Sequence, residues 1–65
     1  MSYETEQHML ALDALRDGDV CEAKNILDDC DDEVSSYVSE LLETQEEDDI
    51  RHAETMLEES IDGDM

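Results

Sequence analysis

The chain has 65 residues, of which 22 are Asp or Glu and three are Lys or Arg, giving a formal net charge of −19 at pH 7. This length excludes a second domain and leaves little room for an enclosed substrate cavity, and the charge opposes direct binding to nucleic-acid phosphates. Because 38% of the residues are hydrophobic, with two glycines and no proline, the sequence predicts a single all-α domain over residues 1–65 and not a disordered acidic tail.

The first two predicted helices are joined by a tight turn. Ser2 can cap a helix over residues 3–16, and Gly18 suits the position just beyond it, where the backbone is often left-handed. Asp19 can then cap a second helix, which ends in the aspartate cluster at 28–32.

Apolar residues cover most of the circumference of the first helix, which predicts a central position in the fold. Met9, Leu12 and Leu15 share one side and are expected in the core. Tyr3, Leu10 and Ala14 either pack on the other half of the molecule, which we favour, or cover a dimer contact. The core face of the second helix is predicted to contain Val20, Ala23, Ile26, Leu27 and Cys30.

The third helix has the clearest amphipathic pattern, capped by Asp31 or Asp32. Its apolar residues recur at i, i+3, i+4, i+7 and i+8, and they are Val34, Tyr37, Val38, Leu41 and Leu42. The opposite face is predicted to carry glutamates spaced by Ser36 and Ser39.

The fourth helix is predicted over about residues 49–61, with Gly63 just beyond its end. A break at 46–49 is expected, although Glu47 and Arg51 could pair at i, i+4 in a continuous helix. The apolar stripe of this helix is Ile50, Ala53, Leu57 and Ile61. Because short connections favour antiparallel neighbours, we predict a compact bundle of about four short helices, arranged as two αα-hairpins.

The sequence offers no clear metal or catalytic site. The cluster at 28–33 lacks the glycine and the spacing of a calcium loop, and His8 and His52 lie on different predicted helices without cysteine neighbours. Cys21 and Cys30 would lie ~13 Å apart on one helix, beyond the ~7 Å of a disulfide, so we predict reduced cysteines that act as small hydrophobic residues. An intermolecular disulfide is the alternative. We expect no cofactor, no metal and no enzymatic activity.

The first ten residues and the lengths of the apolar runs predict the cellular location of the protein. The first ten residues lack the basic and apolar regions of a signal peptide, and no apolar run approaches the ~18 residues of a membrane span. We therefore expect a cytoplasmic protein that does not contact a membrane.

Part of the first half resembles a known repeat. Residues 9–28 are similar to the helix–turn–helix of a tetratricopeptide repeat, through Leu15, Gly18-Asp19, Glu22-Ala23 and Ile26-Leu27. The resemblance implies a helical hairpin in which Gly-Asp marks the turn and the alanine packs between the helices. A tetratricopeptide array requires several repeats, so the resemblance supports the hairpin alone.

The whole chain resembles small acidic phage-encoded inhibitors, including anti-CRISPR and anti-restriction proteins that mimic DNA, in its size, charge and helical amphipathicity. This resemblance implies a partner in the host cytoplasm, either a basic DNA-binding protein or a nucleoprotein complex, bound by a monomer or weak homodimer. Sixteen of the 22 acids lie in residues 28–65, which places the expected binding surface there.

The proposed contacts are carboxylates on helices. Carboxylates at i, i+3 and i+4 have Cβ atoms about 5–6 Å apart, which approximates the spacing of neighbouring phosphates. The candidate partner-binding residues are Asp28, Asp29, Asp31, Asp32, Glu33, Glu40, Glu43, Glu46, Glu47, Asp48, Asp49, Glu58 and Glu59. The alternatives are an acidic helical adaptor or antirepressor that binds a basic protein without DNA mimicry, and a protein whose acidity is a halophilic adaptation.

Overall fold

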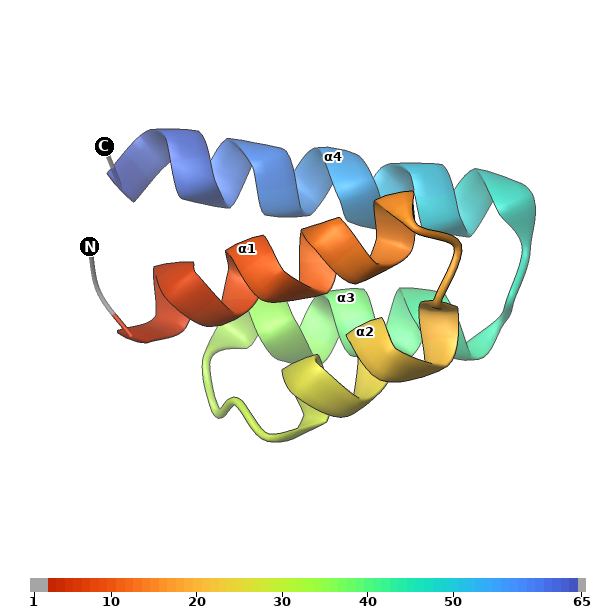
Figure 1. Cartoon of the computed structure of the whole chain (residues 1–65), viewed down its shortest axis with the longest axis horizontal. Helices are drawn as coiled ribbons and strands as arrows, with labels where there is room; N and C mark the ends of the chain where they lie inside the picture. The colour runs from red at the N-terminus through yellow and green to blue at the C-terminus, as the bar shows by residue number, and fades with distance from the viewer. Residues whose placement is uncertain (1–2, 65) are drawn as a thin grey trace.

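Four helices follow one another along residues 3–64, the part of the chain that the computed structural model describes (Figure 1). They are α1 (Tyr3–Arg16), α2 (Val20–Asp28), α3 (Glu33–Glu43) and α4 (Glu47–Asp64). The predicted all-α bundle of four short helices is confirmed. The predicted cap Ser2 lies outside the described residues.

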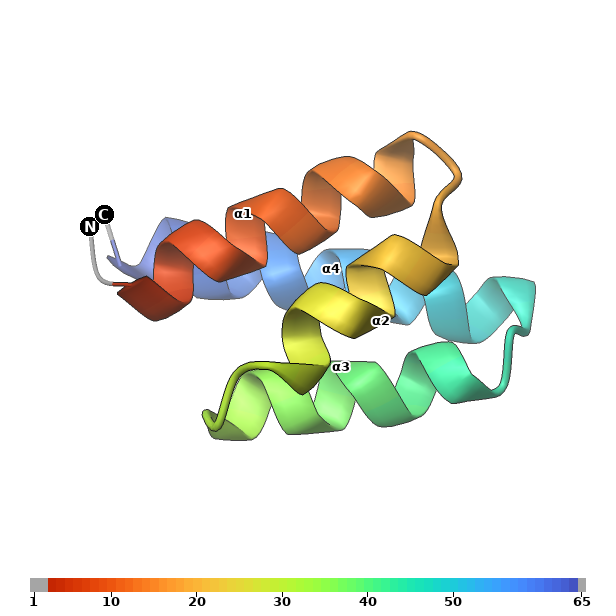
Figure 2. The ribbon, with the colours of Figure 1, turned by 60° about the horizontal axis from the view of Figure 1, so that its bottom comes forward.

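The helices form a closed ring in which each packs against its two neighbours, with α4 returning to lie beside α1. Successive helices run in alternating directions, so the start of α1 and the end of α4 lie at one end of the bundle (Figures 1 and 2). The α2–α3 connection lies at this same end, and the other two connections lie at the opposite end. The resulting body measures 29 × 20 × 19 Å.

The core is small and rich in alanine, which lets the helices approach closely. Every helix contributes to it, and α1 contributes most. The predicted central position of α1 is wrong, because α1 is one of four helices in the ring and has two neighbours like the others. Its buried members are Ala11, Leu12, Ala14, Leu15, Ala23, Leu27, Val38, Leu42, Ala53 and Leu57. Ile50 and Ile61 from the predicted stripe of α4 pack against its edge.

The α1–α2 turn forms as the sequence predicts. Gly18 has a φ of +87°, its N–H donates to the carbonyl of Leu15 at 3.0 Å, and the N–H of Asp19 donates to that of Ala14 at 2.8 Å. This pair of bonds is a Schellman motif, which satisfies the last carbonyls of a helix. The Asp19 carboxylate then accepts from the N–H of Glu22 at 3.1 Å and caps α2.

Asp32 is the cap of α3, which decides between the two predicted candidates. Its carboxylate accepts from the backbone N–H of Ser35 at 3.0 Å and from the Ser35 hydroxyl at 2.7 Å. Asp28, at the end of α2, accepts from the Ser39 hydroxyl and from Lys24 at 3.0 Å. These hydrogen bonds lower the pKa of Asp28 and connect the end of α2 to α3.

The α3–α4 break begins earlier than predicted, and α4 is longer at both ends. Gln45 adopts a φ of +57° just after α3, a conformation that usually favours glycine. Glu47 belongs to α4, and its carboxylate lies 3.8 Å from Arg51. Gly63 lies inside α4 and lacks a positive φ, so its predicted position beyond the helix is wrong. The helix continues because a single glycine in the last turn weakens a helix without stopping it.

The predicted burial of α1 is partly wrong. Met9 is 39% exposed and Leu10 is 50% exposed, because the neighbours of α1 cover only the side that carries the alanines and Leu12. Tyr3 is also exposed, whereas Ala14 is buried. Of the three residues expected to pack on the other helices, only Ala14 does so.

The buried face of α3 is rotated relative to the prediction. Ser39 was assigned to the polar face, yet it is buried, together with Ser35, where each hydroxyl bonds an aspartate. Tyr37 was assigned to the core but is 44% exposed. The two serine hydroxyls therefore face Asp32 and Asp28, and Tyr37 lies on the exposed side of the helix.

The cysteines are both free thiols, as predicted. Cys30 is buried after the end of α2, and burial is the main cause that raises its pKa. Cys21 is exposed, so the prediction that both cysteines act as small hydrophobic residues is wrong for Cys21.

The two glycines give a matched pair of stability tests. A Cβ added at either position meets no atom within 4 Å, so any effect comes from the backbone. Gly18→Ala should lower the free energy of unfolding by about 1 kcal/mol, because alanine is disfavoured at positive φ. Gly63→Ala should raise it by a few tenths of a kcal/mol, because alanine favours helix. Urea denaturation measures both, and effects of the same sign would contradict the assigned conformations.

Candidate partner-binding surface

The thirteen candidate acids are distributed over two ends of the bundle and along the helices between them. Asp28, Asp29, Asp31, Asp32 and Glu33 surround the α2–α3 connection, at the end where α1 begins. Glu43, Glu46, Glu47, Asp48 and Asp49 surround the α3–α4 connection at the opposite end. Glu40 lies on α3 between the two groups, and Glu58 and Glu59 lie towards the end of α4.

Six of these acids have partners within the fold. Glu58 pairs with Arg16 at 2.7 Å, Glu43 lies 3.8 Å from Lys24, and the Thr44 hydroxyl donates to Asp49. Asp28, Asp32 and Glu47 have the contacts given above. These residues therefore contribute to the local structure of the bundle as well as to its negative surface.

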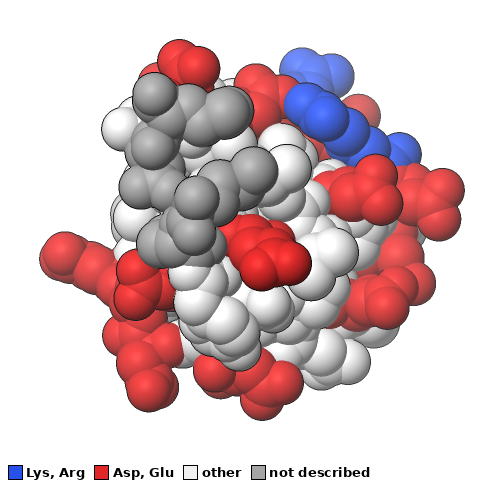
Figure 3. Space-filling view, turned by 60° about the vertical axis from the view of Figure 1, so that its left-hand side comes forward, with Lys and Arg blue, Asp and Glu red and all other residues white. Residues whose placement is uncertain are grey.

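The other seven candidates form no hydrogen bond or ion pair from their carboxylates within residues 3–64, and all seven are exposed. They are Asp29, Asp31, Glu33, Glu40, Glu46, Asp48 and Glu59. Figure 3 shows acidic side chains around most of the visible outline, whereas the Lys and Arg side chains gather along one edge. Most of the negative charge is therefore left without a neighbouring cation.

The outer side of α3 carries a row of exposed acids that is interrupted by an aromatic residue. Glu33, Glu40 and Glu43 are exposed, and Tyr37 lies between the first two in sequence. The Tyr37 ring lies against that of His52 on α4, with 6.0 Å between ring centroids. The acidic row is therefore less regular than the sequence pattern predicts.

His8 is the main feature that the sequence analysis missed. Its ring is buried, with 3% of the residue exposed, and contacts three separate parts of the fold. The Nε2 atom lies 2.9 Å from Asp32 and 3.0 Å from the Ser35 hydroxyl, and Nδ1 lies 2.9 Å from the Ser60 hydroxyl. His8 thus connects α1 to the cap of α3 and to the last turns of α4.

The hydrogens of this network can be assigned from its chemistry. Burial raises the pKa of the Asp32 carboxyl, whereas hydrogen bonds from the hydroxyl and the backbone N–H of Ser35 and from His8 lower it. The bonds from Ser35 and His8 outweigh burial, so the pKa of Asp32 lies below its usual range. An ionised carboxylate only accepts, so His8 donates from Nε2. The Ser60 hydroxyl can then donate to a neutral ring or accept from a protonated one.

Hydrogen bonds connect Asp32 to His8 and His8 to Ser60, which is the connectivity of the acid, base and nucleophile in a hydrolase triad. The surroundings of these residues do not suit catalysis. Ser60 lies within α4, where backbone N–H groups bond within the helix and are not free to stabilise an oxyanion. Asp32 and Glu4 line the adjoining pocket and would repel a developing negative charge. We therefore assign the network to folding.

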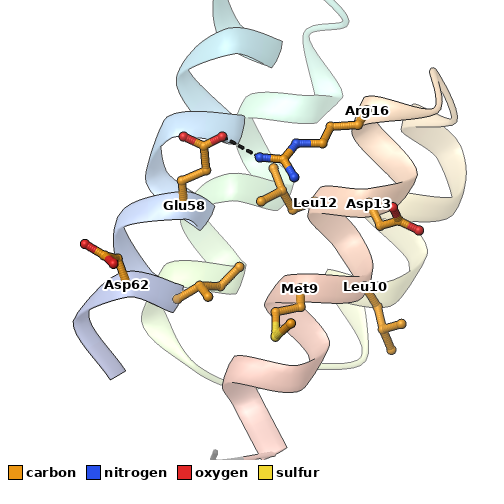
Figure 4. A pocket seen from close by; sticks show the side chains of 8 residues that line it. Met9, Leu10, Leu12, Asp13, Arg16, Glu58 and Asp62 are labelled. Atoms are coloured by element: carbon orange, nitrogen blue, oxygen red, sulfur yellow. Dashed lines mark hydrogen bonds and ion pairs between the residues drawn. The ribbon is translucent and has the colours of Figure 1, made fainter. Parts of the chain in front are cut away.

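A groove lies between α1 and α4, on a side of the molecule that the sequence analysis did not single out (Figure 4). Met9, Leu12 and Ile61 supply apolar surface, and Arg16 reaches across it to Glu58. The sequence of α1 contains more apolar residues than one buried face needs. This excess, which includes Met9 and Leu10, is the signal from which the groove could have been predicted.

Among residues 3–64, no three His, Cys, Asp or Glu side chains converge in a way that could hold a metal ion. No helix in this part of the chain combines the length and apolar character required to cross a bilayer.

Comparisons with known proteins gave no match, whether to protein-family models, to curated proteins or to solved structures. The α1–α2 hairpin has the form that the tetratricopeptide resemblance implies, and the resemblance remains a local pattern.

The role of the His8 network in stability is tested by two serines. Ser60→Ala should lower the free energy of unfolding by about 1–3 kcal/mol, because it leaves the buried Nδ1 atom of His8 without a partner. Ser36→Ala is the control, because Ser36 is exposed on α3. This variant should change the free energy of unfolding by less than about 0.5 kcal/mol. Equal effects in chemical denaturation would contradict the proposed contribution of the network.

The Asp32 carboxylate should also make stability depend on pH. Since its pKa is lowered by folding, the ionised group stabilises the native state above its unfolded pKa of about 3.8, and this contribution is lost as pH falls through the folded pKa. Asp32→Asn keeps a good helix cap but removes the charge. The difference in unfolding free energy between the two proteins should shrink as the pH falls below about 4. A difference that stays constant down to pH 2.5 would rule out this linkage.

Proposed function

We propose that this protein is an acidic inhibitor that mimics duplex DNA and occludes the basic DNA-binding surface of a host defence complex, such as a CRISPR effector. The observation that carries the proposal is the set of seven exposed carboxylates without partners in residues 3–64. In a chain with a net charge of −19, these groups repel one another and weaken the folded state. A basic partner would relieve that repulsion on binding.

The electrostatics favour fast and selective association. Arginines of the partner could bind carboxylates with two parallel hydrogen bonds, and lysines could bind them as point charges. A strongly negative surface attracts a positive one over several ångströms and raises the association rate, and salt reduces this effect. A protein bound in this way would prevent duplex DNA from entering the same basic channel.

The arrangement of the helices supports a two-dimensional array of charge. Glu33 and Glu40 on α3 are seven residues apart, which corresponds to ~10 Å along a helix. Glu59 lies on the neighbouring α4, and packed helices are usually 8–10 Å apart. Rows on two such helices have a separation comparable with the ~12 Å width of the DNA major groove.

A second candidate function is an acidic helical adaptor that binds a basic protein without imitating DNA. The groove between α1 and α4 favours this candidate, because its exposed Met9 adds an apolar contact that a duplex lacks. An adaptor of this kind should bind with a weaker dependence on salt than a DNA mimic does.

Two charge-matched variants test DNA mimicry. Asp31→Asn, Glu33→Gln and Glu40→Gln together remove three charges from the candidate surface. Glu6→Gln, Asp17→Asn and Glu22→Gln remove three exposed charges outside it. The native protein and the second variant should capture a DNA-binding complex from host lysate at low salt, and added duplex DNA should displace it. The first variant should bind at least about tenfold more weakly in a follow-up titration with the purified complex.

The control outcome separates mimicry from general acidity. Equal weakening by both variants would show that the total charge matters and that its placement does not, which would contradict mimicry. Binding that duplex DNA does not displace would also contradict it and would favour the adaptor. Circular dichroism of the three proteins establishes that the substitutions leave the helical fold intact.

A further inference from the structure

The groove between α1 and α4 is an apolar surface within an otherwise acidic molecule. It has a volume of about 500 Å³. Figure 4 shows Met9 and Leu12 between the two helices, whereas Leu10 lies along the outer side of α1. Ile61 of α4 also lines the groove. With Met9 39% and Leu10 50% exposed, the chain leaves large apolar side chains in water although its core is small.

The rim of the groove is negative. Asp13 on α1 and Glu58 and Asp62 on α4 line it, against a single cation, Arg16. Arg16 already pairs with Glu58 at 2.7 Å, so Asp13 and Asp62 are available to an incoming cation. The groove therefore combines an apolar floor with acidic sides.

We propose that this groove binds a cationic amphipathic helix of the partner protein. The inference rests on the proposed function, in which the partner is basic, and it adds a second contact surface of different chemistry. Apolar side chains at i, i+3 or i+4, and i+7 of the incoming helix contact Met9 and Ile61, above the buried Leu12. Its flanking lysines or arginines pair with Asp13 and Asp62.

The shape of the site suits a helix. The helices α1 and α4 are antiparallel neighbours (Figure 1), and residues of both helices line the groove. A third helix lying along such a groove at the usual distance of about 8–10 Å is ordinary helix packing. Methionine at the contact adapts to differently shaped apolar side chains, since its side chain is unbranched and flexible.

A second copy of this chain is a poorer occupant on electrostatic grounds. Two copies would each carry a net charge of −19, and pairing through this groove would place the Asp13 and Asp62 carboxylates of both copies near one interface. Repulsion between these like charges would oppose association of the two copies. A cationic helix reverses the sign of this interaction.

The test uses two synthetic peptides and two variants of the full chain. One 18-residue peptide of leucine and lysine places its leucines on one helical face, and a scrambled peptide of the same composition has no apolar face. Met9→Gln with Leu10→Gln alters the groove without changing charge or helix propensity greatly. Tyr37→Gln removes an exposed apolar residue outside the groove and is the matched control. Fluorescence anisotropy measures binding, and methyl NMR spectra report on Met9 and Ile61.

The native chain and the Tyr37→Gln variant should bind the amphipathic peptide at least about tenfold more tightly than the scrambled one, with methyl shifts at Met9 and Ile61. The groove variant should lose this preference but still bind the scrambled peptide through charge. Equal binding of both peptides by the native chain would overturn the groove proposal and leave the acidic-surface proposal standing. Failure to bind either cationic peptide would contradict both. Self-association that the groove variant abolishes would show that the occupant is a second copy.

Discussion

Electrostatic repulsion is the constraint on which the arrangement of this fold depends. Carboxylates outnumber Lys and Arg by 22 to three, and a core of ten buried residues has to outweigh their mutual repulsion. The helices reduce the repulsion locally by placing acids where the helix macrodipole is positive, as in the first turn of α4 with Glu47, Asp48 and Asp49. Asp19 and Asp32 cap helices, and Asp28 bonds the Ser39 hydroxyl of α3. Some acids are therefore structural, and the others are left to the surface.

The helices could be predicted because their determinants are local. Gly18 and Asp19 specify the α1–α2 turn through backbone geometry and one side-chain acceptor, and both act within a few residues of themselves. The His8 network could not be predicted, because its partners lie 24, 27 and 52 residues away along the chain. A histidine on the flank of an apolar face gives no signal of which elements will meet there. His8 reaches Ser60 because α4 returns to pack beside α1 and so closes the ring of four helices.

The sequence predicts which residues lie on each helix, but it predicts less well which side of each helix faces the core. Periodicity identifies which residues share a face, but a rotation of one helix by part of a turn exchanges neighbouring residues between core and surface. On α3 this rotation buries Ser35 and Ser39 because their hydroxyls satisfy Asp32 and Asp28, and it exposes Tyr37. On α1 the apolar residues exceed what the bundle covers, which leaves Met9 at the groove.

The acidic surface and the groove would act over different distances in one binding event. The attraction between opposite charges extends to about a Debye length, roughly 10 Å at 0.1 M salt, and so governs how often a basic partner arrives. Apolar contact in the groove acts only after the surfaces meet and is little affected by salt, so it governs how long the partner stays. A surface of exposed carboxylates alone attracts cationic proteins of every kind. The apolar side chains of the groove, together with Asp13 and Asp62, favour only those cationic proteins that also present an amphipathic helix, and this second requirement is what would make an intensely acidic protein selective.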